Sequence, residues 1–281
     1  MNTYNHTRMI EFEDKHFVKY LSLLGIEKQS PNFEYLKEIL KAHVLKIPFE
    51  NISKLYFYKR INLKKLIDFE LYLDGIEKYG FGGTCYANNF YLYQLLSWLG
   101  YNIKLCGADM KNHDVHIVSI VNIDNHEFLI DTGYAAPFLE PIPLDLLNDY
   151  IIDMGADRFI LKPQNNNKQS HLELHRNGKL VHGYMVNPKA RKIDEFRQVI
   201  KDSFKESSTF MNALLLTRFD SGNFIVIHNM SIIKSSGKVS KRNSIKSIEQ
   251  LTSVINRYFN IPKMIVMESI DKLQMQKNAW N

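Results

Sequence analysis

The sequence predicts an α+β protein in which helices come first and antiparallel strands follow. Apolar residues recur at helical spacing through about the first 80 residues, and short β-rich runs separated by turn residues begin at about residue 100. A segment near the end again has the spacing of an amphipathic helix. Short strands at this spacing indicate a β-barrel or an open antiparallel sheet.

Two helices are expected before residue 50. The first is expected to end at Gly25, and the second at Ile47-Pro48, because a residue that precedes proline disfavours the α region. Their apolar faces consist of Phe17, Tyr20, Leu21 and Leu24 in the first helix and Leu36, Ile39, Leu40 and Val44 in the second.

Turn residues separate the expected strands, among them Asp124-Asn125, the three asparagines 165–167 and Asn177-Gly178. The expected strands cover residues 101–106, 115–121, 128–130, 158–161, 171–174, 213–218 and 224–228, the last two with Ser221-Gly222 between them. A polar helical stretch is expected near 192–206 and an amphipathic helix over 247–258.

Composition places the 281-residue chain among ordinary globular proteins, with 45% hydrophobic and 23% charged residues. The net charge is +6, but the basic residues form small groups, such as Lys59-Arg60 and Lys64-Lys65, and no long run. We therefore interpret them as solvated faces or as contacts to an anionic ligand, and we expect no nucleic-acid partner.

The sequence also bears on the cellular compartment. Two cysteines do not form a disulfide framework, and the start of the chain lacks the apolar stretch of a signal peptide. No run of about 18 apolar residues, the length that spans a membrane, is present. We expect a cytoplasmic protein with reduced thiols and no membrane partner.

Cys85 is the candidate nucleophile because of the segment around it. Residues 81–84 include two glycines and end at Thr84, a candidate N-cap that places Cys85 in the first turn of an apolar helix over 86–99. Unpaired N–H groups and the helix dipole there favour a thiolate over a thiol. A lone cysteine is also compatible with a small buried core residue, which is our interpretation of Cys106.

His116 and Asp131 are the candidate base and its orienting carboxylate. If the turn between their strands has two residues, Ile123 faces His126, and a four-residue loop closed by Asn122 and Glu127 gives the same register. The two side chains then become diagonal neighbours roughly 7–8 Å apart at Cα. A three-residue loop would instead place them on opposite faces. Such a pair can take the proton of a cysteine thiol, although a purely structural polar pair is the alternative.

Other ionisable residues compete for these two roles. They lie in expected loops, where no facing partner is fixed, and are His113, Asp109, Asp114 and Asp124. We therefore prefer the triad Cys85, His116 and Asp131.

Four motifs, in a fixed order and with matching gaps, resemble those of the arylamine N-acetyltransferase family. Gly82-Gly83-Thr84-Cys85-Tyr86 with Asn89 is similar to the family's Arg-Gly-Gly-x-Cys-x-Glu-x-Asn, and Ile47-Pro48-Phe49-Glu50-Asn51 to its Ile-Pro-Phe-Glu-Asn. His116 begins an apolar strand, as the family histidine does, and Asp131-Thr132-Gly133-Tyr134 resembles Asp-Val-Gly-Phe. The likeness runs from about residue 12 to Ile261.

The resemblance implies a three-domain fold with a catalytic core like that of cysteine proteases. An N-terminal helical bundle, residues 1–88, would carry Cys85, and a central antiparallel β-barrel, residues 89–195, would carry His116 and Asp131. A C-terminal α/β lid would cover residues 196–281.

The resemblance also implies a reaction, which is ping-pong acetyl transfer without a metal. Cys85 would take the acetyl group of the cosubstrate acetyl-CoA and pass it to an arylamine, arylhydroxylamine or hydrazine, as in xenobiotic metabolism. Thr84 and Gly83 are the expected contacts to coenzyme A, a polyanion that suits the basic chain. The backbone N–H groups of Cys85 and Thr84 are the expected oxyanion donors.

Two residues depart from the family pattern. Phe81 stands where the family has arginine, and Ala87 where it has glutamate, which predicts an ion pair replaced by apolar packing. The surroundings of Cys85 are thereby less positive, which predicts a higher thiol pKa or an altered acceptor pocket. Glu50 and Asn51 are expected to cap or brace an interface without contacting substrate.

Three other functions remain open. The same fold is compatible with an amide synthase that acts on a carrier-bound acyl chain in natural-product biosynthesis. Phe81 and Ala87 also suit a low-activity or non-catalytic protein that binds coenzyme A or another small molecule. Thiol-protease chemistry uses the same triad, but the surrounding motifs do not indicate it.

Overall fold

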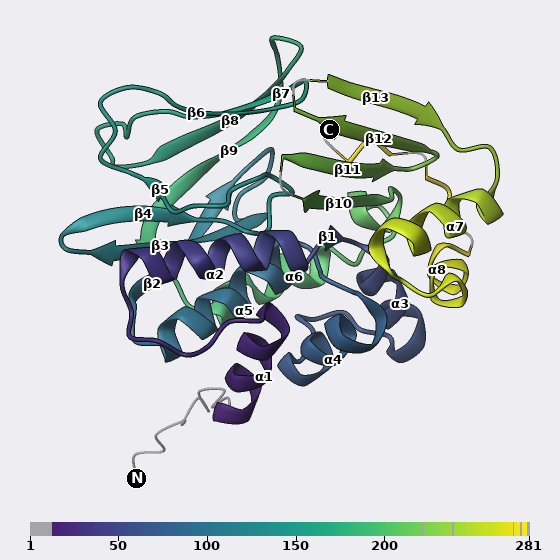
Figure 1. Cartoon of the computed structure of the whole chain (residues 1–281), viewed down its shortest axis with the longest axis horizontal. Helices are drawn as coiled ribbons and strands as arrows, with labels where there is room; N and C mark the ends of the chain where they lie inside the picture. Colours follow the sequence, from purple (N-terminus) through teal and green to yellow (C-terminus); the bar gives the residue numbers. More distant parts are fainter. Residues whose placement is uncertain (1–12, 221, 238, 272, 276, 280–281) are drawn as a thin grey trace.

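Helices and two antiparallel sheets form the computed structural model, which describes residues 13–220, 222–237, 239–271, 273–275 and 277–279. Most helices lie along the bottom of the view in Figure 1, the larger sheet lies at the upper left, and the smaller sheet lies at the upper right. Ser221, expected in a turn, is outside the described residues, as is the segment 1–12. The expected α+β class is confirmed.

The helical part precedes the larger sheet in the sequence. Its helices are α1 (Asp14–Leu24), α2 (Phe33–Lys46), α3 (Ile52–Ile61), α4 (Phe69–Tyr79) and α5 (Cys85–Trp98). The first helix ends as expected at Gly25, whose φ of 64° is the left-handed conformation that favours glycine, and α2 ends at Ile47. Helix α5 is buried along most of its length, so it forms the centre of the helical part.

The larger sheet has eight strands in the order β5-β4-β3-β2-β9-β8-β7-β6 and curls into a nearly closed barrel. Its strands are β2 (Asn102–Asp109), β3 (His116–Ile123), β4 (His126–Ile130), β5 (Ile142–Pro143), β6 (Tyr150–Met154), β7 (Asp157–Leu161), β8 (Ser170–Arg176) and β9 (Lys179–Ala190). One apolar cluster fills the space within this sheet, and a larger one joins β2 and β3 to helix α5.

The smaller sheet combines two distant parts of the chain. Strand β1 (Phe49–Glu50) pairs with β10, so that Phe49 faces Thr217, and the order is β1-β10-β11-β12-β13. Its other strands are β10 (Leu215–Asp220), β11 (Asn223–His228), β12 (Ser231–Ser236) and β13 (Val239–Ser244). The helices of this part of the chain are the 3₁₀ helices η1 (Ile193–Phe196) and η2 (Thr209–Met211) and the α-helices α6 (Arg197–Asp202), α7 (Ile248–Phe259) and α8 (Lys263–Ile270).

Each segment expected as a helix or strand adopts that structure, with boundaries shifted by one to three residues in most cases. The stretch 192–206 forms η1 and α6, and the terminal amphipathic segment forms α7. The sequence interpretation did not delimit α3 and α4 within the segment expected to be helical, and it omitted β1, β5, β6, β9, β12, β13 and α8. Strand β13 is exposed at every residue and β9 at both ends, so neither has the clear apolar alternation that reveals a strand.

The membrane expectation concerns helix length and composition. Among the described residues, no helix is long and apolar enough to cross a membrane.

Candidate active site

Cys85 is the first residue of α5 and is held there by contacts to the preceding turn. Glu50 accepts backbone N–H bonds from Gly82 at 3.1 Å and from Ser53 at 2.9 Å, and its own N–H bonds the carbonyl of Gly83 at 3.1 Å. A Cβ on Gly82 would collide with the Pro48 carbonyl oxygen, so only glycine allows this approach. The expected placement of Cys85 in the first helical turn is confirmed.

The N-cap position is Thr84, as expected, but its hydroxyl forms no capping hydrogen bond. The first N–H groups of a helix have no acceptor one turn earlier in the helix, so the start of α5 directs N–H donors toward the region around Cys85. These donors and the helix dipole favour a negative charge at this point.

His116 and Asp131 meet in the geometry that the hairpin register predicts. Ile123 faces His126 across a two-residue turn that contains Asp124, and the pairing continues along β3 and β4. His116 is the first residue of β3, and Asp131 directly follows β4. Their side chains are buried, with Nε2 of His116 2.8 Å from Oδ2 of Asp131. The conditional prediction of a two-residue turn is therefore correct.

Asp131 is held from several sides. Its Oδ1 accepts hydrogen bonds from the Asn89 amide at 2.8 Å and the Gly133 N–H at 2.9 Å, and its Oδ2 accepts the Tyr184 hydroxyl at 2.8 Å. Burial by itself would raise the pKa of Asp131, but His116 and these donors overcome it and lower the pKa. Asp131 is thus a buried carboxylate that remains ionised.

The imidazole of His116 connects Asp131 to Cys85. Burial would lower the pKa of His116, but its interactions with Asp131 and Cys85 together raise it to about 10. Because Nε2 bonds Asp131, Nδ1 is the nitrogen left for Cys85. The Cys85 thiol also lies 3.9 Å from the carbonyl oxygen of Val115, the residue before His116. The structure therefore brings all three predicted residues together.

A glycine lets the Asp131 loop approach the nucleophile. A Cβ on Gly133 would lie 2.6 Å from the Cα of Cys85 and 2.8 Å from Nδ2 of Asn89, too close for any other residue without a shift of the backbone. Asn89 also accepts the N–H of Thr132 at 2.8 Å, so one side chain of α5 secures this loop. Tyr184, on β9, is a site residue that sequence reasoning missed.

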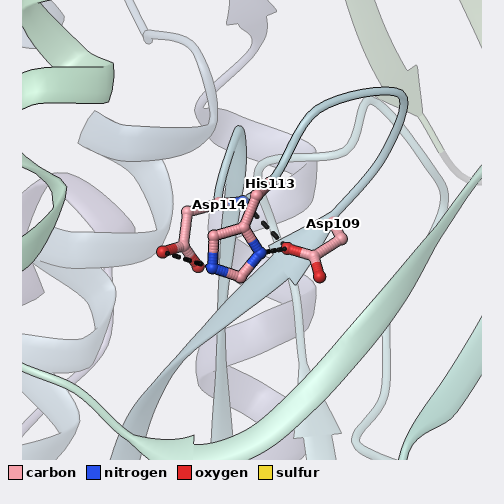
Figure 2. A group of neighbouring side chains, drawn as sticks. All are labelled: Asp109, His113 and Asp114. Atoms are coloured by element: carbon pink, nitrogen blue, oxygen red, sulfur yellow. Dashed lines mark hydrogen bonds and ion pairs between the residues drawn. The ribbon is translucent and has the colours of Figure 1, made fainter.

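Three of the four competing candidates form a separate cluster, shown in Figure 2, whereas Asp124 lies in the turn between β3 and β4. Nδ1 of His113 is 2.7 Å from Asp109, and its Nε2 is 3.2 Å from Asp114. The expectation that these loop residues lack a fixed partner is wrong, because Arg191 also holds Asp114, at 3.0 Å. The Asp114 carbonyl accepts the Tyr86 hydroxyl at 2.5 Å. We interpret this cluster as ion pairs that fix the loop over the start of α5.

The family departures have a clear packing consequence. Phe81 is 1% exposed and its ring packs against those of Tyr56, Phe57 and Tyr79. Ala87 is also buried. The expected replacement of charge by apolar packing is confirmed at both positions.

The remaining single residues also have assigned environments. Asn51 bonds the carbonyls of Phe210 and Ala213 and accepts the N–H of Leu215, which is the bracing role expected of it. Cys106 is fully buried in a strand, and burial raises its thiol pKa to about 12, in line with a structural core residue.

A small cavity of about 50 Å³ adjoins the turn before Cys85. Gly83 and Thr84, the expected contacts to coenzyme A, line it together with Lys54, Ser203 and Phe204. Their roles toward a ligand stay predictions.

Comparison with known proteins decides the family. A family model described as N-acetyltransferase matches residues 32–265. The chain belongs to the arylamine N-acetyltransferase family. One relative is the arylamine N-acetyltransferase pineal gland isozyme NAT-3 of Gallus gallus, 30% identical over 148 residues, which are 48% of this chain and 49% of that protein.

A second relative has a different name. Proansamycin X synthase of Amycolatopsis mediterranei is 26% identical over 132 residues, which cover 44% of this chain and 50% of that protein. The chain thus spans about half the length of each of these two curated relatives.

The fold of the family extends over nearly the whole chain. The arylamine N-acetyltransferase of Mycobacterium marinum, solved in complex with CoA, superimposes with a TM-score of 0.76 at 16% identity. The superposition covers 92% of this chain and 99% of that one. At this identity the likeness establishes the fold.

Proposed function

We propose that the protein transfers an acetyl group from acetyl-coenzyme A to an arylamine, arylhydroxylamine or hydrazine, with Cys85 as the acyl carrier. The observation that carries the proposal is the buried His116–Asp131 pair beside a cysteine at a helix start. Nucleophilic acyl transfer needs a thiolate, an imidazole and an orienting carboxylate in this order. Family membership favours acetyl over other acyl groups.

In the first half-reaction the Cys85 thiolate adds to the thioester carbonyl carbon, and the carbonyl electron pair moves onto oxygen. The backbone N–H groups of Cys85 and Thr84 are the proposed donors to this oxyanion, because they lie at a helix start. The oxyanion then collapses and expels the thiolate of coenzyme A, which takes the proton held on His116. The acetyl group remains on Sγ of Cys85 as a thioester.

In the second half-reaction the acceptor nitrogen adds to the acetyl carbon. Neutral His116 takes the proton from that nitrogen, and the oxyanion collapses with loss of the Cys85 thiolate. Asp131 holds the imidazole in one orientation and stabilises its cationic form in both half-reactions. The amide product leaves, and the thiolate–imidazolium pair is restored.

The proposal also covers the contacts to coenzyme A, the domain boundaries and the cellular compartment. Gly83 and Thr84 line the cavity beside Cys85 and are proposed to contact coenzyme A, which also suits the net charge of +6. We propose the division into a helical bundle (1–88), a barrel (89–195) and an α/β lid (196–281), in a cytoplasmic protein.

The test is direct. The purified protein is incubated with acetyl-coenzyme A and a panel of arylamines and hydrazines, and thiol release is followed together with the mass of the Cys85 peptide. We expect acetylated Cys85 and turnover in the wild-type protein and in Cys106→Ala, and neither in Cys85→Ala. Absence of acetylation and of turnover with every acceptor would overturn the proposal and favour a non-catalytic coenzyme A-binding protein.

An amide synthase is the second candidate, favoured by the likeness to Proansamycin X synthase. The chemistry at Cys85 would be the same, but the acyl chain would be long and would carry its own aromatic amine. A thioester of such a chain, offered in competition with acetyl-coenzyme A, separates the two. Faster acylation of Cys85 by the long chain, followed by ring closure, would replace acetyl transfer as the function.

A further inference from the structure

Lys54 is a basic side chain beside the nucleophile that the reaction above does not use. It belongs to α3 and lines the same cavity as residues 82–84, Tyr86 and Ala87. These wall residues flank Cys85 on both sides in the sequence. Lys54 is therefore a cation placed against the turn that positions the thiol.

The Lys54 ammonium is held in place by neutral groups. Its Nζ donates to the Ser203 hydroxyl at 2.6 Å and lies 4.0 Å from the centre of the Phe204 ring. Within the described part of the chain, no carboxylate forms an ion pair with it. A partly buried cation without a counter-anion is costly, so a negative charge nearby would stabilise it.

The charged and titratable groups around this cavity point to one counter-anion. Lys65 also lines the cavity, but it pairs with Asp68 at 2.9 Å. The Tyr86 hydroxyl donates to a carbonyl, and burial raises its pKa well above the usual range. Glu50 is a buried carboxylate near the cavity, but its oxygens accept the N–H groups of Gly82 and Ser53, and burial raises its pKa. His116 and Asp131 pair with one another. We therefore assign Lys54 to the remaining candidate anion, the thiolate of Cys85.

The electrostatic surroundings of Lys54 support Cys85 as its counter-anion. Burial lowers the pKa of Lys54 to about 7, and the Cys85 thiolate acts in the opposite direction and raises it. Because an electrostatic interaction acts on both partners, an ammonium at Lys54 favours a negative charge at Cys85. Phe81, which packs against Phe57 in the wall of the cavity, provides no charge of its own.

We propose that Lys54 is a positioning residue whose ammonium, acting across the cavity wall, stabilises the thiolate of Cys85 together with the His116 imidazolium. It supplies from α3 a positive charge beside the nucleophile that Phe81 cannot supply. The inference rests on the proposed role of Cys85 as nucleophile, but it concerns the charge state of Cys85 and not the acyl group that Cys85 carries.

The proposal has a definite pH dependence. Because the Lys54 pKa is about 7, its ammonium is present below pH 7 and is lost as the pH rises through that value. Its contribution to the thiolate is therefore greatest under acidic conditions, where an ordinary thiol, with a pKa of about 8.5, is protonated. Above about pH 8 the His116–Asp131 pair stabilises the thiolate without the Lys54 ammonium.

The experiment measures iodoacetamide labelling of the Cys85 peptide by mass spectrometry from pH 5 to pH 9, in the full chain without substrate. In Lys54→Met we expect the labelling midpoint to rise by roughly one pH unit, and the rate at pH 6 to fall about tenfold, with little change at pH 9. Lys54→Arg keeps the charge and should restore the wild-type rate at pH 6. Lys65→Met, at the same cavity, should leave the profile unchanged.

Each other outcome overturns the proposal. An unchanged profile in Lys54→Met, or a rate reduced equally at every pH, would show that Lys54 only packs. Failure of Lys54→Arg to restore labelling, in a protein with wild-type thermal unfolding, would do the same. Failure of the proposed function would give a different result. Wild-type Cys85 would keep its labelling profile but would take no acetyl group from acetyl-coenzyme A.

Discussion

Two histidines three residues apart, His113 and His116, each contact a carboxylate at nearly the same distance, 2.7 Å and 2.8 Å. Their surroundings differ: the His113 side chain is 68% exposed and that of His116 is 1% exposed. Water and salt screen the first pair, whereas the second interacts in a medium of low dielectric constant. Contact distance alone therefore does not identify the functional histidine.

The partners of the two carboxylates differ as well. Asp131 has each oxygen occupied by donors from separate elements, including Asn89 on α5 and Tyr184 on β9. Asp109, the last residue of β2, bonds the loop that directly follows it, through His113 and the backbone N–H of Asp114. A buried charge with complete hydrogen bonding keeps one geometry, which is what a catalytic base requires.

Exchange of the carboxylate for an amide should separate the two pairs most strongly. Asp131→Asn keeps the shape but removes the charge that orients His116, and we expect acetyl transfer to fall by about 10³–10⁴-fold. In Asp109→Asn the rate of acetyl transfer should stay within about threefold of the wild-type rate, because exposed ion pairs contribute roughly 0–1 kcal/mol. Steady-state thiol release measures both, and similar losses in the two variants would contradict the contrast.

The stability of the two regions should also respond differently to pH. The folded-state pKa of His116 is raised to about 10, so its contribution is complete below the unfolded-state pKa of about 6.5 and is lost as the pH rises toward 10. The pKa of Asp131 is lowered, so its contribution is present above its ordinary value and is lost in acid.

Urea unfolding of the wild-type protein and His116→Gln measures this effect. The difference between their unfolding free energies should be largest at about pH 5–6 and should narrow by roughly 1.4 kcal/mol per unit of pKa shift as the pH approaches 10. His113→Gln serves as the control and should give a small difference at every pH. If the difference in unfolding free energy between the wild-type protein and His116→Gln were the same at every pH, the charge of His116 would not contribute to stability.

A single hydroxyl should have the smallest effect. Tyr184→Phe removes one of the donors to Asp131 and leaves Asn89 and the Gly133 N–H in place. We expect a loss of about 1 kcal/mol in unfolding free energy and a few-fold reduction in acetyl transfer. A loss as large as that of Asp131→Asn would mean that Tyr184 contacts the reacting groups.

The sequence was sufficient for the part of the site that local rules determine. The start of α5 follows from the turn at 81–84, and the meeting of His116 and Asp131 follows from a two-residue turn at Asp124-Asn125. In both cases the interacting residues are close in the sequence, and backbone geometry fixes their relative positions.

The rest depends on contacts between distant segments. Tyr184 reaches Asp131 from 53 residues away, and Lys54 meets Ser203 from 149 residues away. No local spacing encodes either distance, and α3, which carries Lys54, was not delimited within the segment expected to be helical. The Asp109–His113–Asp114 cluster was not predicted for a different reason. The conformation of the loop decides whether such residues meet, and the sequence does not determine that conformation.

The pairing of β1 with β10 has a consequence for the order of folding. Asn51, directly after β1, bonds Leu215 across 164 residues, and without that partner its buried amide would lack acceptors and donors. During synthesis the N-terminal part emerges first, but this region cannot complete its hydrogen bonds until β10 has left the ribosome. The segment that bonds the turn before Cys85 is thus finished late, and the thiol is fixed in position only when most of the chain exists.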